Sequence, residues 1–447
     1  MARMNEIDMT HGPLAGKMLR FALPLAASSV LQQLFNSADL AVVGRFANAD
    51  AMAAVGSNAP VINLLVSLFV GLSVGANVVI ANLVGSGRRE RIRDAVHTSI
   101  ALALASGVFL LVAGIVLSPF ILRLMGAPQN VMSLAVIYLR IYFLGMPAMM
   151  VYNFGSAVLR SRGDSKRPFF CLTLAGIINI ALNLLFVIVF QLHVIGVALA
   201  TVLSNCVSAG LVLRFLATET GEFRLDFRRL RFHSEFLRSI LRVGLPAGLQ
   251  GMVFALSNVV IQSGVNSFGA NCIAGMTAAQ NFEYVSWCTI NAFAQTVVTF
   301  TGQNYGAGDE QRCRKVLRLG LTICIGVDLI ILAAILLSRH VIIQLFTTDP
   351  AVIAFSMVRF ERVVALHFLC ATYEVPGGAM RGMNRSMVPA LISVLGTCAF
   401  RLLYIFTLFP LNRTIENLML VYPASWVLTG IVMNAAYFIV RKKAFAK

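Results

Sequence analysis

The sequence is short of charge, and most of the charge that it has is positive. Of its 447 residues 12% are charged and 58% are hydrophobic, whereas an ordinary soluble domain carries about a quarter charged residues. Asp and Glu together number 19, against 36 Lys and Arg. Apolar runs of about 20 residues, long enough to cross a bilayer, recur along the whole chain. The composition therefore excludes an ordinary soluble protein and predicts an all-α polytopic membrane protein.

Motifs that carry enzyme chemistry are also missing. The eight cysteines lie far apart without a CxxC pair, which is typical of small buried side chains and not of disulfides or metal ligands. The sequence contains no GxxxxGK[ST] loop, no hydrolase elbow and no metal-spaced His/Cys cluster. The first sixteen residues are too polar for a signal peptide, so the first span is expected to direct insertion. We expect a protein that is not an enzyme, uses no ATP and needs no cofactor.

Apolar segments between charged or turn-rich breaks predict twelve transmembrane helices. They cover residues 17–43, 53–84, 95–120, 131–159, 168–190, 194–217, 239–267, 273–303, 316–338, 352–380, 386–410 and 418–440.

The breaks between these spans alternate in charge. Four arginines occur in "GRRERIR" (87–93), and further basic clusters follow every second span. The opposite loops hold only Arg45, Arg123, Arg339 and Arg413. Because basic residues collect on the cytoplasmic side of membrane proteins, both termini are expected in the cytoplasm. Topology thus explains the net charge of +17, and the expected partner is the lipid bilayer, not nucleic acid.

The two halves of the chain resemble each other at a nearly constant offset. "LRFALP" (19–24) matches "LRVGLP" (241–246), and "LRSRGDSKRP" (159–168) matches "MRGMNRSMVP" (380–389). Six spans in each half give both halves the same orientation, which is a parallel repeat. We expect an N-terminal lobe at 1–216, a cytoplasmic linker at 217–238 and a C-terminal lobe at 239–447. The linker is rich in arginine and aromatic residues, which also suit anionic lipid headgroups.

Polar side chains inside the first lobe point to an ion site, because such residues are costly in a membrane. In the first span Gln32, Asn36 and Asp39 share one helical face. The fifth span offers Asn179 and Asn183 one turn apart, and the sixth span offers Thr201, Asn205 and Ser208 on one face. Carboxylate, amide and hydroxyl oxygens are ligands for a hard cation such as sodium, and the Asp39 carboxyl could instead take a proton. The alternative is a hydrogen-bonded seam between helices.

The second lobe carries its acids elsewhere. Ile261 stands where the repeat would place a counterpart of Asp39. Glu283 shares the eighth span with Trp287, and Glu374 shares the tenth span with His367. Acids and aromatic rings together favour an organic cation, through charge pairing and cation–π contact, or a proton site.

Two acids of this lobe leave other readings open. Glu374 could instead form a structural pair with a membrane arginine such as Arg401, and Asp328 in the ninth span has no polar companions at helical spacing.

Several segments resemble the multidrug and toxic compound extrusion (MATE) transporters. "GPLAGKMLRFALPLAASSVLQQLFNSADLAVVGRF" (12–46) looks like the first helix of that family, and "VTFTGQNYGAGDEQRCRK" (298–315) and "AMRGMNRSMVPALIS" (379–393) resemble two further segments of it. The resemblance implies two six-helix lobes around a V-shaped cleft. It also implies export of organic, often cationic, compounds in exchange for sodium ions or protons.

In several members of that family a cation site is formed by an aspartate, an asparagine, an acid and a threonine. The resemblance places this site at Asp39, Asn179, Asn183 and Thr201, with Asn183 standing in place of the acid. We expect a monomeric antiporter for small organic cations. The rival interpretations are a flippase for lipids or lipid-linked sugars and a passive channel.

Overall fold

The computed structural model describes residues 6–46, 49–124, 129–344 and 346–446, and these contain helices and no strand. The N-terminal half holds α1 (Leu14–Phe46), α2 (Ala49–Gly85), α3 (Arg89–Leu124), α4 (Gln129–Leu144), α5 (Met146–Ser161), α6 (Lys166–Leu184) and α7 (His193–Thr218). The C-terminal half holds α8 (Ser234–Asn266), α9 (Ala270–Gly306), α10 (Glu310–Gln344), α11 (Pro350–Arg362), α12 (Ala371–Gly382), α13 (Met387–Ser393), α14 (Phe400–Thr407) and α15 (Ile415–Phe445).

Several of these helices join into longer stretches. A bend of 45° at Gly145 separates α4 from α5, where Pro147 occupies the first turn of the second helix. A π-helical segment, Leu185–Val189, extends α6, and a 3₁₀ segment, Val364–Cys370, joins α11 to α12. A second π-helical segment, Val394–Ala399, joins α13 to α14. Joined in this way, the helical stretches coincide with the twelve predicted spans to within about six residues at each end.

Nine of the described helices are long and apolar enough to cross a membrane, or ten if α4 and α5 form one span. The two stretches that fall short of this criterion are α9 and the α11–α12 pair. They carry Glu283, Arg359 and Glu374, and charged residues of this kind are costly inside a membrane.

By compactness the chain divides into two units, and each is described separately. The first unit comprises residues 1–8 and 23–248, and the second comprises residues 9–22 and 249–447. α1 and α8 therefore each contribute to both units. The predicted lobes at 1–216 and 239–447 follow the sequence repeat instead, and they stay a prediction.

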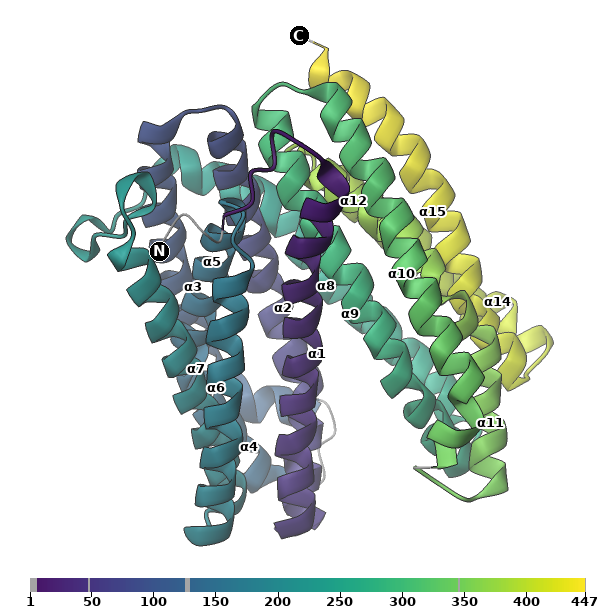
Figure 1. The fold of residues 1–447 in the computed structure, drawn as a ribbon. Coiled ribbons are helices and arrows are strands. Elements are labelled where there is room, and N and C mark those ends of the chain that lie inside the picture. Colours follow the sequence, from purple (N-terminus) through teal and green to yellow (C-terminus); the bar gives the residue numbers. More distant parts are fainter. Residues whose placement is uncertain (1–5, 47–48, 125–128, 345, 447) are drawn as a thin grey trace. The chain divides into compact units, whose positions relative to one another are not determined.

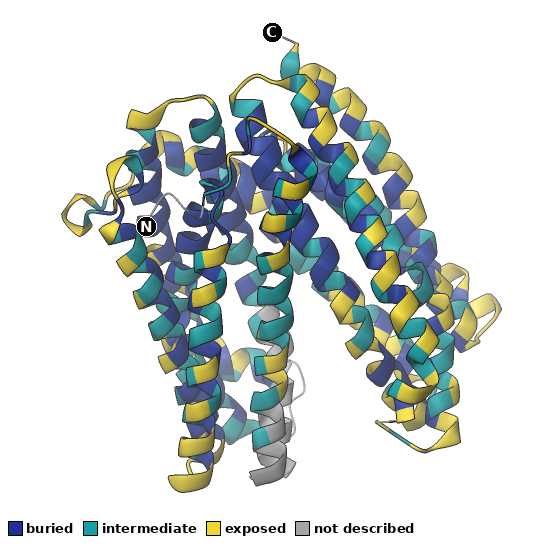
Figure 2. Ribbon diagram, in the orientation of Figure 1, coloured by how far each residue is buried: buried dark blue, intermediate teal, exposed yellow. Residues whose placement is uncertain are grey.

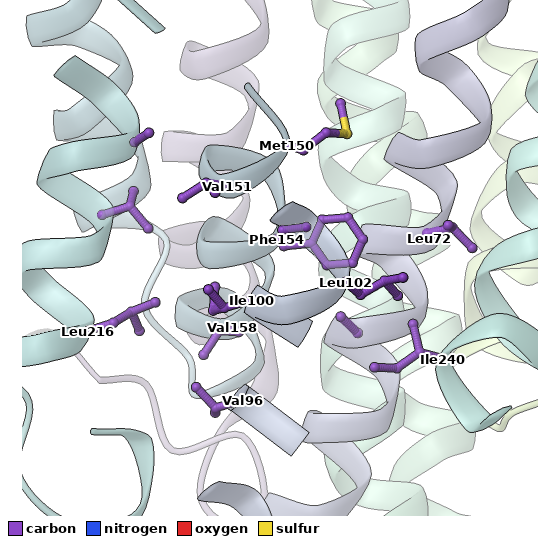
Figure 3. Close-up of a cluster of buried hydrophobic side chains, with 14 of the residues drawn as sticks. Leu72, Val96, Ile100, Leu102, Met150, Val151, Phe154, Val158, Leu216 and Ile240 are labelled. Atoms are coloured by element: carbon purple, nitrogen blue, oxygen red, sulfur yellow. The ribbon is translucent and has the colours of Figure 1, made fainter. Parts of the chain in front are cut away.

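The core of the first unit is apolar and lies among α2, α3, α5, α7 and the start of α8. Figure 3 shows Phe154 of α5, Leu102 of α3 and Leu72 of α2 in this cluster, and each of these side chains is buried. A full set of apolar neighbours of this kind stabilises a core residue by about 1.5–3 kcal/mol in water. Within a membrane, close packing of the side chains stabilises the core instead.

Glycines allow α2 and the start of α8 to approach closely within the first unit. Gly71 and Gly75 are four residues apart on α2, and Gly244 and Gly248 are four apart on α8. A Cβ at Gly71 would lie 2.3 Å from the Gly248 backbone, and one at Gly75 would lie 2.4 Å from the Ile240 carbonyl oxygen. Such paired small residues are the usual means of bringing membrane helices into contact.

The outer faces of the helices are apolar as well. On α3 the side chains of Val108, Phe109, Val112 and Val116 are exposed, and Figure 2 shows exposed residues along the outer sides of α10 and α15. A continuous apolar exterior would be a liability in water but is what lipid contact requires. All eight cysteines are free, and all except Cys206 are buried, as the sequence predicts.

Candidate functional site

Four residues predicted for the coupling site come together in the first unit. Asn183 of α6 donates a hydrogen bond from Nδ2 to Asp39 Oδ1 of α1, and a second from the same atom to Asn179 Oδ1 at 3.3 Å. The Thr201 hydroxyl of α7 donates to the Val197 carbonyl oxygen at 3.0 Å and lies near the Asp39 carboxyl group. Three helices thus bring one carboxylate, two amides and a hydroxyl to one place, which we call the Asp39 cluster.

Packing between α1 and α6 explains how Asp39 reaches Asn183. A Cβ on Gly176 of α6 would lie 1.7 Å from Cε2 of Phe35 on α1. The absence of a side chain at Gly176 therefore lets the Phe35 ring lie against α6. Asp39 follows Phe35 by one helical turn, and Asn179 and Asn183 follow Gly176 along the same helix, so the close approach aligns the polar residues.

One oxygen atom of the Asp39 cluster is buried without a hydrogen-bond partner among the described residues. Asn179 is 5% exposed and Asn183 is 1% exposed, and Asn183 Oδ1 is a buried acceptor without a hydrogen-bond partner in the described structure. A buried oxygen without a donor is costly, and a small cation or a proton-bearing group would satisfy it. No three His, Cys, Asp or Glu side chains gather among the described residues, so a transition-metal centre is not indicated there.

Two tyrosines of α4 adjoin the Asp39 cluster. Tyr138 and Tyr142 stack at 6.0 Å between ring centroids, and both are close enough to Asp39 to interact with its charge. The sequence interpretation did not single them out. Two tyrosines one helical turn apart in a predicted span were the available signal, but apolar packing explains such a pair equally well.

Gln32 and Asn36 lie apart from this cluster. Both side chains are exposed, and within the described residues neither shares a hydrogen bond with Asp39, Asn179 or Asn183. Their supporting role therefore stays a prediction.

In the second unit Glu283 is not a free acid. Arg359 of α11 contacts Glu283 Oε2 of α9 through Nε at 2.9 Å and through Nη2 at 2.8 Å, and the Arg359 side chain is 4% exposed. His367 Nε2 lies 3.8 Å from Glu283 Oε1. His367, which the sequence groups with Glu374 on the tenth span, thus lies near Glu283 instead, and a buried arginine neutralises the acid. Arg359 was missed, although a basic residue inside a predicted span is itself a signal.

Trp287 belongs to an aromatic group around a second buried arginine. Its ring stacks on Phe254 at 6.3 Å, and the Arg401 guanidinium lies 5.1 Å from the Phe254 centroid and 4.7 Å from that of Tyr422. Arg401 is 1% exposed and donates to Ser425 Oγ and Asn258 Oδ1, each at 3.1 Å. Within the described residues no acid lies in ion-pair range of it, so this part of the unit carries an excess positive charge.

Asp328 gains the companions that its sequence context did not show. It is fully buried on α10 beside the Ser286 hydroxyl of α9, and Ser286 Oγ lies 2.6 Å from His367 Nδ1. Neither Asp328 oxygen has a hydrogen-bond partner in the described part of the chain. Asp328, Ser286, His367 and Glu283 therefore form a polar path in which, among the described residues, only the contact between Ser286 and His367 is a hydrogen bond.

Glu374 lies outside this path and pairs with a different arginine from the one expected. Arg381 Nη1 of the same helix, α12, lies 3.9 Å from Glu374 Oε2, and Arg381 Nη2 donates to Gln250 Oε1 at 2.8 Å. Since no ion pair between Glu374 and Arg401 occurs among the described residues, the predicted alternative partner is corrected to Arg381.

Membrane-spanning helices in a tandem repeat, with buried polar clusters, are typical of membrane transport proteins. The MatE family model matches this chain twice, over residues 24–185 and 246–407, and the chain belongs to that family. The two matches confirm the internal repeat and its offset, and structures of the family have twelve helices in two repeats. Members of this family are transporters.

Curated relatives align over most of the chain. The probable multidrug resistance protein YoeA of Bacillus subtilis is 29% identical over 95% of this chain and 94% of its own length. The probable multidrug resistance protein NorM of Thermotoga maritima is 28% identical over 86% of this chain and 84% of its own length. An FAD transporter of Shewanella oneidensis is 24% identical over 77% of both chains.

Solved structures share the fold at low identity. A MOP superfamily transporter from Pyrococcus furiosus, described as having a binding pocket of reverse polarity, has a TM-score of 0.90 and is 22% identical over 98% of both chains. An outward-facing multidrug resistance MATE family transporter has a TM-score of 0.87, also at 22% identity and 98% coverage of both chains.

Proposed function

We propose that this protein is a secondary active antiporter of a bacterial inner membrane that exports organic compounds in exchange for sodium ions or protons. The observation that carries the proposal is the Asp39 cluster, in which a single carboxylate meets amide and hydroxyl oxygens of two other helices. One carboxylate with neutral oxygens suits a monovalent cation. Alternatively, the Asp39 carboxylate accepts a proton when the amide hydrogen bond to it breaks. The protein acts as a monomer with both termini in the cytoplasm.

In this mechanism Asp39 binds the driving ion and changes the contacts of α1 with α6 and α7. With the carboxylate charged and free of an ion, Asn183 holds it by donating from Nδ2. When a cation or a proton binds, it neutralises the Asp39 carboxylate and weakens the hydrogen bond from Asn183. The Asn183 amide can then rotate so that its unpartnered Oδ1 faces the bound cation or proton. Ion occupancy thereby shifts the balance between two arrangements of the helices.

Replacing Asp39 by Asn tests this assignment. Drug resistance and efflux of a fluorescent substrate should fall to the level of cells without the protein, since an amide has no negative charge to hold the ion and does not take the proton. Membrane expression should be unchanged. Glu361→Gln, which removes an exposed acid outside the cluster, serves as the control and should export normally. Full efflux by the Asp39 variant would exclude the assignment.

A second variant separates the two driving ions. Asn183→Asp places another carboxylate beside Asp39, which strengthens the binding of a metal cation. If sodium drives export, this variant should work at lower sodium concentrations than the natural protein. If protons drive export, added sodium should leave its rate unchanged or inhibit it.

The substrate remains, in our proposal, an organic cation held by Glu374 and the aromatic rings of the second unit. A flippase for anionic lipids or lipid-linked sugars is the second candidate, and the buried Arg401 without an acid partner favours it. Competition of a cationic dye against a lipid pyrophosphate for the purified protein distinguishes the two. Preferential binding of the lipid pyrophosphate would favour the flippase.

A further inference from the structure

A basic pocket lies in the first unit, where the start of α3 meets the segment between α7 and α8. Its volume is about 320 Å³, and its polar lining consists of Arg93, Asp94, His97, Arg228, Arg229 and Arg231. Figure 1 shows this segment as the teal loops that follow α7. Four arginines against one aspartate leave the pocket with a surplus of positive charge.

The pocket is held in shape by the first turns of α3. His97 is 2% exposed, and its Nδ1 donates to the Arg93 carbonyl oxygen at 2.7 Å while its Nε2 accepts from the Asp226 backbone N–H at 3.1 Å. The Thr98 hydroxyl accepts from the His233 backbone N–H at 3.2 Å. The segment that was expected to be a plain linker is therefore fastened at both sides of its arginine run.

Three of the four arginines have no acid to neutralise them. Arg229 lies 3.5 Å from Asp226, whereas no acid within the described residues lies in ion-pair range of Arg93, Arg228 or Arg231. Arg93 Nε is also buried without a hydrogen-bond partner. Guanidinium groups in this arrangement match the geometry of a phosphate group.

Two exposed aromatic side chains bracket the arginines in "FRRLRF" (227–232). Phe227 is 53% exposed and Phe232 is 50% exposed, while Phe223 and Leu225 of the same segment are buried and hold it to the unit. The candidate spans on either side end at Thr218 and begin at Ser234, so the segment lies at the membrane surface. Exposed aromatic rings next to basic residues are typical of that interface.

We propose that this pocket binds the phosphate of an anionic membrane lipid, and that the side chains of Phe227 and Phe232 insert at the boundary between the lipid headgroups and the acyl chains. The positive-inside pattern places the pocket at the cytoplasmic leaflet, whose anionic lipids attract such basic segments. A soluble phosphate compound would satisfy the arginines equally well but would leave the two exposed phenylalanines without a function.

Lipid retention by the full-length protein tests the proposal. The protein is released from nanodiscs of equal phosphatidylcholine and phosphatidylglycerol, and bound lipid is measured by native mass spectrometry. The natural protein should retain phosphatidylglycerol, and Arg228→Gln with Arg231→Gln should weaken that retention roughly thirty-fold. Arg224→Gln with Arg238→Gln is the control, because it removes two exposed arginines near the pocket that do not line it.

The control pair should retain the lipid almost unchanged. Phe227→Ser with Phe232→Ser should also weaken retention, and millimolar inorganic phosphate should not displace the lipid. Equal loss in both arginine pairs, no preference of the natural protein for phosphatidylglycerol, or displacement by inorganic phosphate would each overturn the proposal. All four arginines replaced are exposed, and a size-exclusion profile verifies that each variant is folded.

Discussion

Buried charges in this protein divide into paired and unpaired ones. Glu283 and Arg359 neutralise each other across two helices, and so do Glu219 and its two arginines at the end of α7. Asp39 and Asp328 have no basic partner in ion-pair range among the described residues. A buried ion pair makes the structure more rigid. An unpaired acid in a membrane is costly, so its presence points to a functional role.

The Glu283–Arg359 pair leads to a stability prediction. Arg359→Leu leaves the acid buried and unpaired, so the free energy of unfolding in detergent should fall by about 3–5 kcal/mol. The double variant Arg359→Leu, Glu283→Leu should recover most of this loss, because neither charge remains. Thermal unfolding of the purified variants measures both effects. A double variant as unstable as the single one would show that the pair is not the cause.

Glu219 gives a pH-dependent prediction outside the membrane. Burial raises the pKa of this carboxyl, but hydrogen bonds from Arg167 and Arg162 outweigh burial and leave the pKa below its ordinary value. The charged form therefore stabilises the fold above a pH of about 4.3, the ordinary value for Glu, and this stability is lost as the pH falls through the lower pKa of the folded state.

Glu219→Gln should accordingly lower the melting temperature at pH 7 and have a smaller effect at a pH of about 3. Melting curves across that range measure the difference. Glu235→Gln removes an acid whose side chain is 65% exposed and serves as the control. An effect of Glu219→Gln that is independent of pH would point to packing instead of charge.

At the scale of helices, close contact depends on the positions of glycines, which have no side chain. Gly176 admits Phe35 between α6 and α1, and four glycines bring α2 against α8. These contacts decide which polar residues face each other. The sequence shows the glycines but not their partners, because one glycine can accept many different neighbours.

Gly176→Ala should therefore separate Asp39 from Asn183. The added methyl group meets the Phe35 ring, and overpacking of this kind typically costs about 1–3 kcal/mol. We expect reduced ion-driven export at near-normal expression, with partial rescue by Phe35→Leu. Gly210→Ala is the control, since a Cβ there meets nothing within 4 Å. Normal export by Gly176→Ala would mean that the contact does not position the site.

At the scale of the whole molecule, transport against a gradient distinguishes the antiporter from its rivals. In proteoliposomes an imposed sodium or proton gradient should drive a fluorescent cation uphill, and the gradient that does so identifies the coupling ion. A passive channel would only equilibrate the dye. A lipid flippase would leave the dye in place and move a labelled lipid.

The sequence by itself determined the all-helical membrane fold, the twelve spans and the parallel repeat. Hydrophobic length and the distribution of basic residues follow directly from the thickness and charge of a bilayer. It also predicted one site at Asp39, Asn179, Asn183 and Thr201, from helical spacing and the family resemblance, and hydrogen bonds join the first three of these residues.

Only the tertiary structure decided which charges meet. Arg359 neutralises Glu283, Arg381 rather than Arg401 lies beside Glu374, and Ser286, which lies beside Asp328, hydrogen-bonds to His367. Side chains on different helices come together through the rotation and close packing of those helices. Helical spacing describes one helix at a time and carries no information about the rotation of its neighbours.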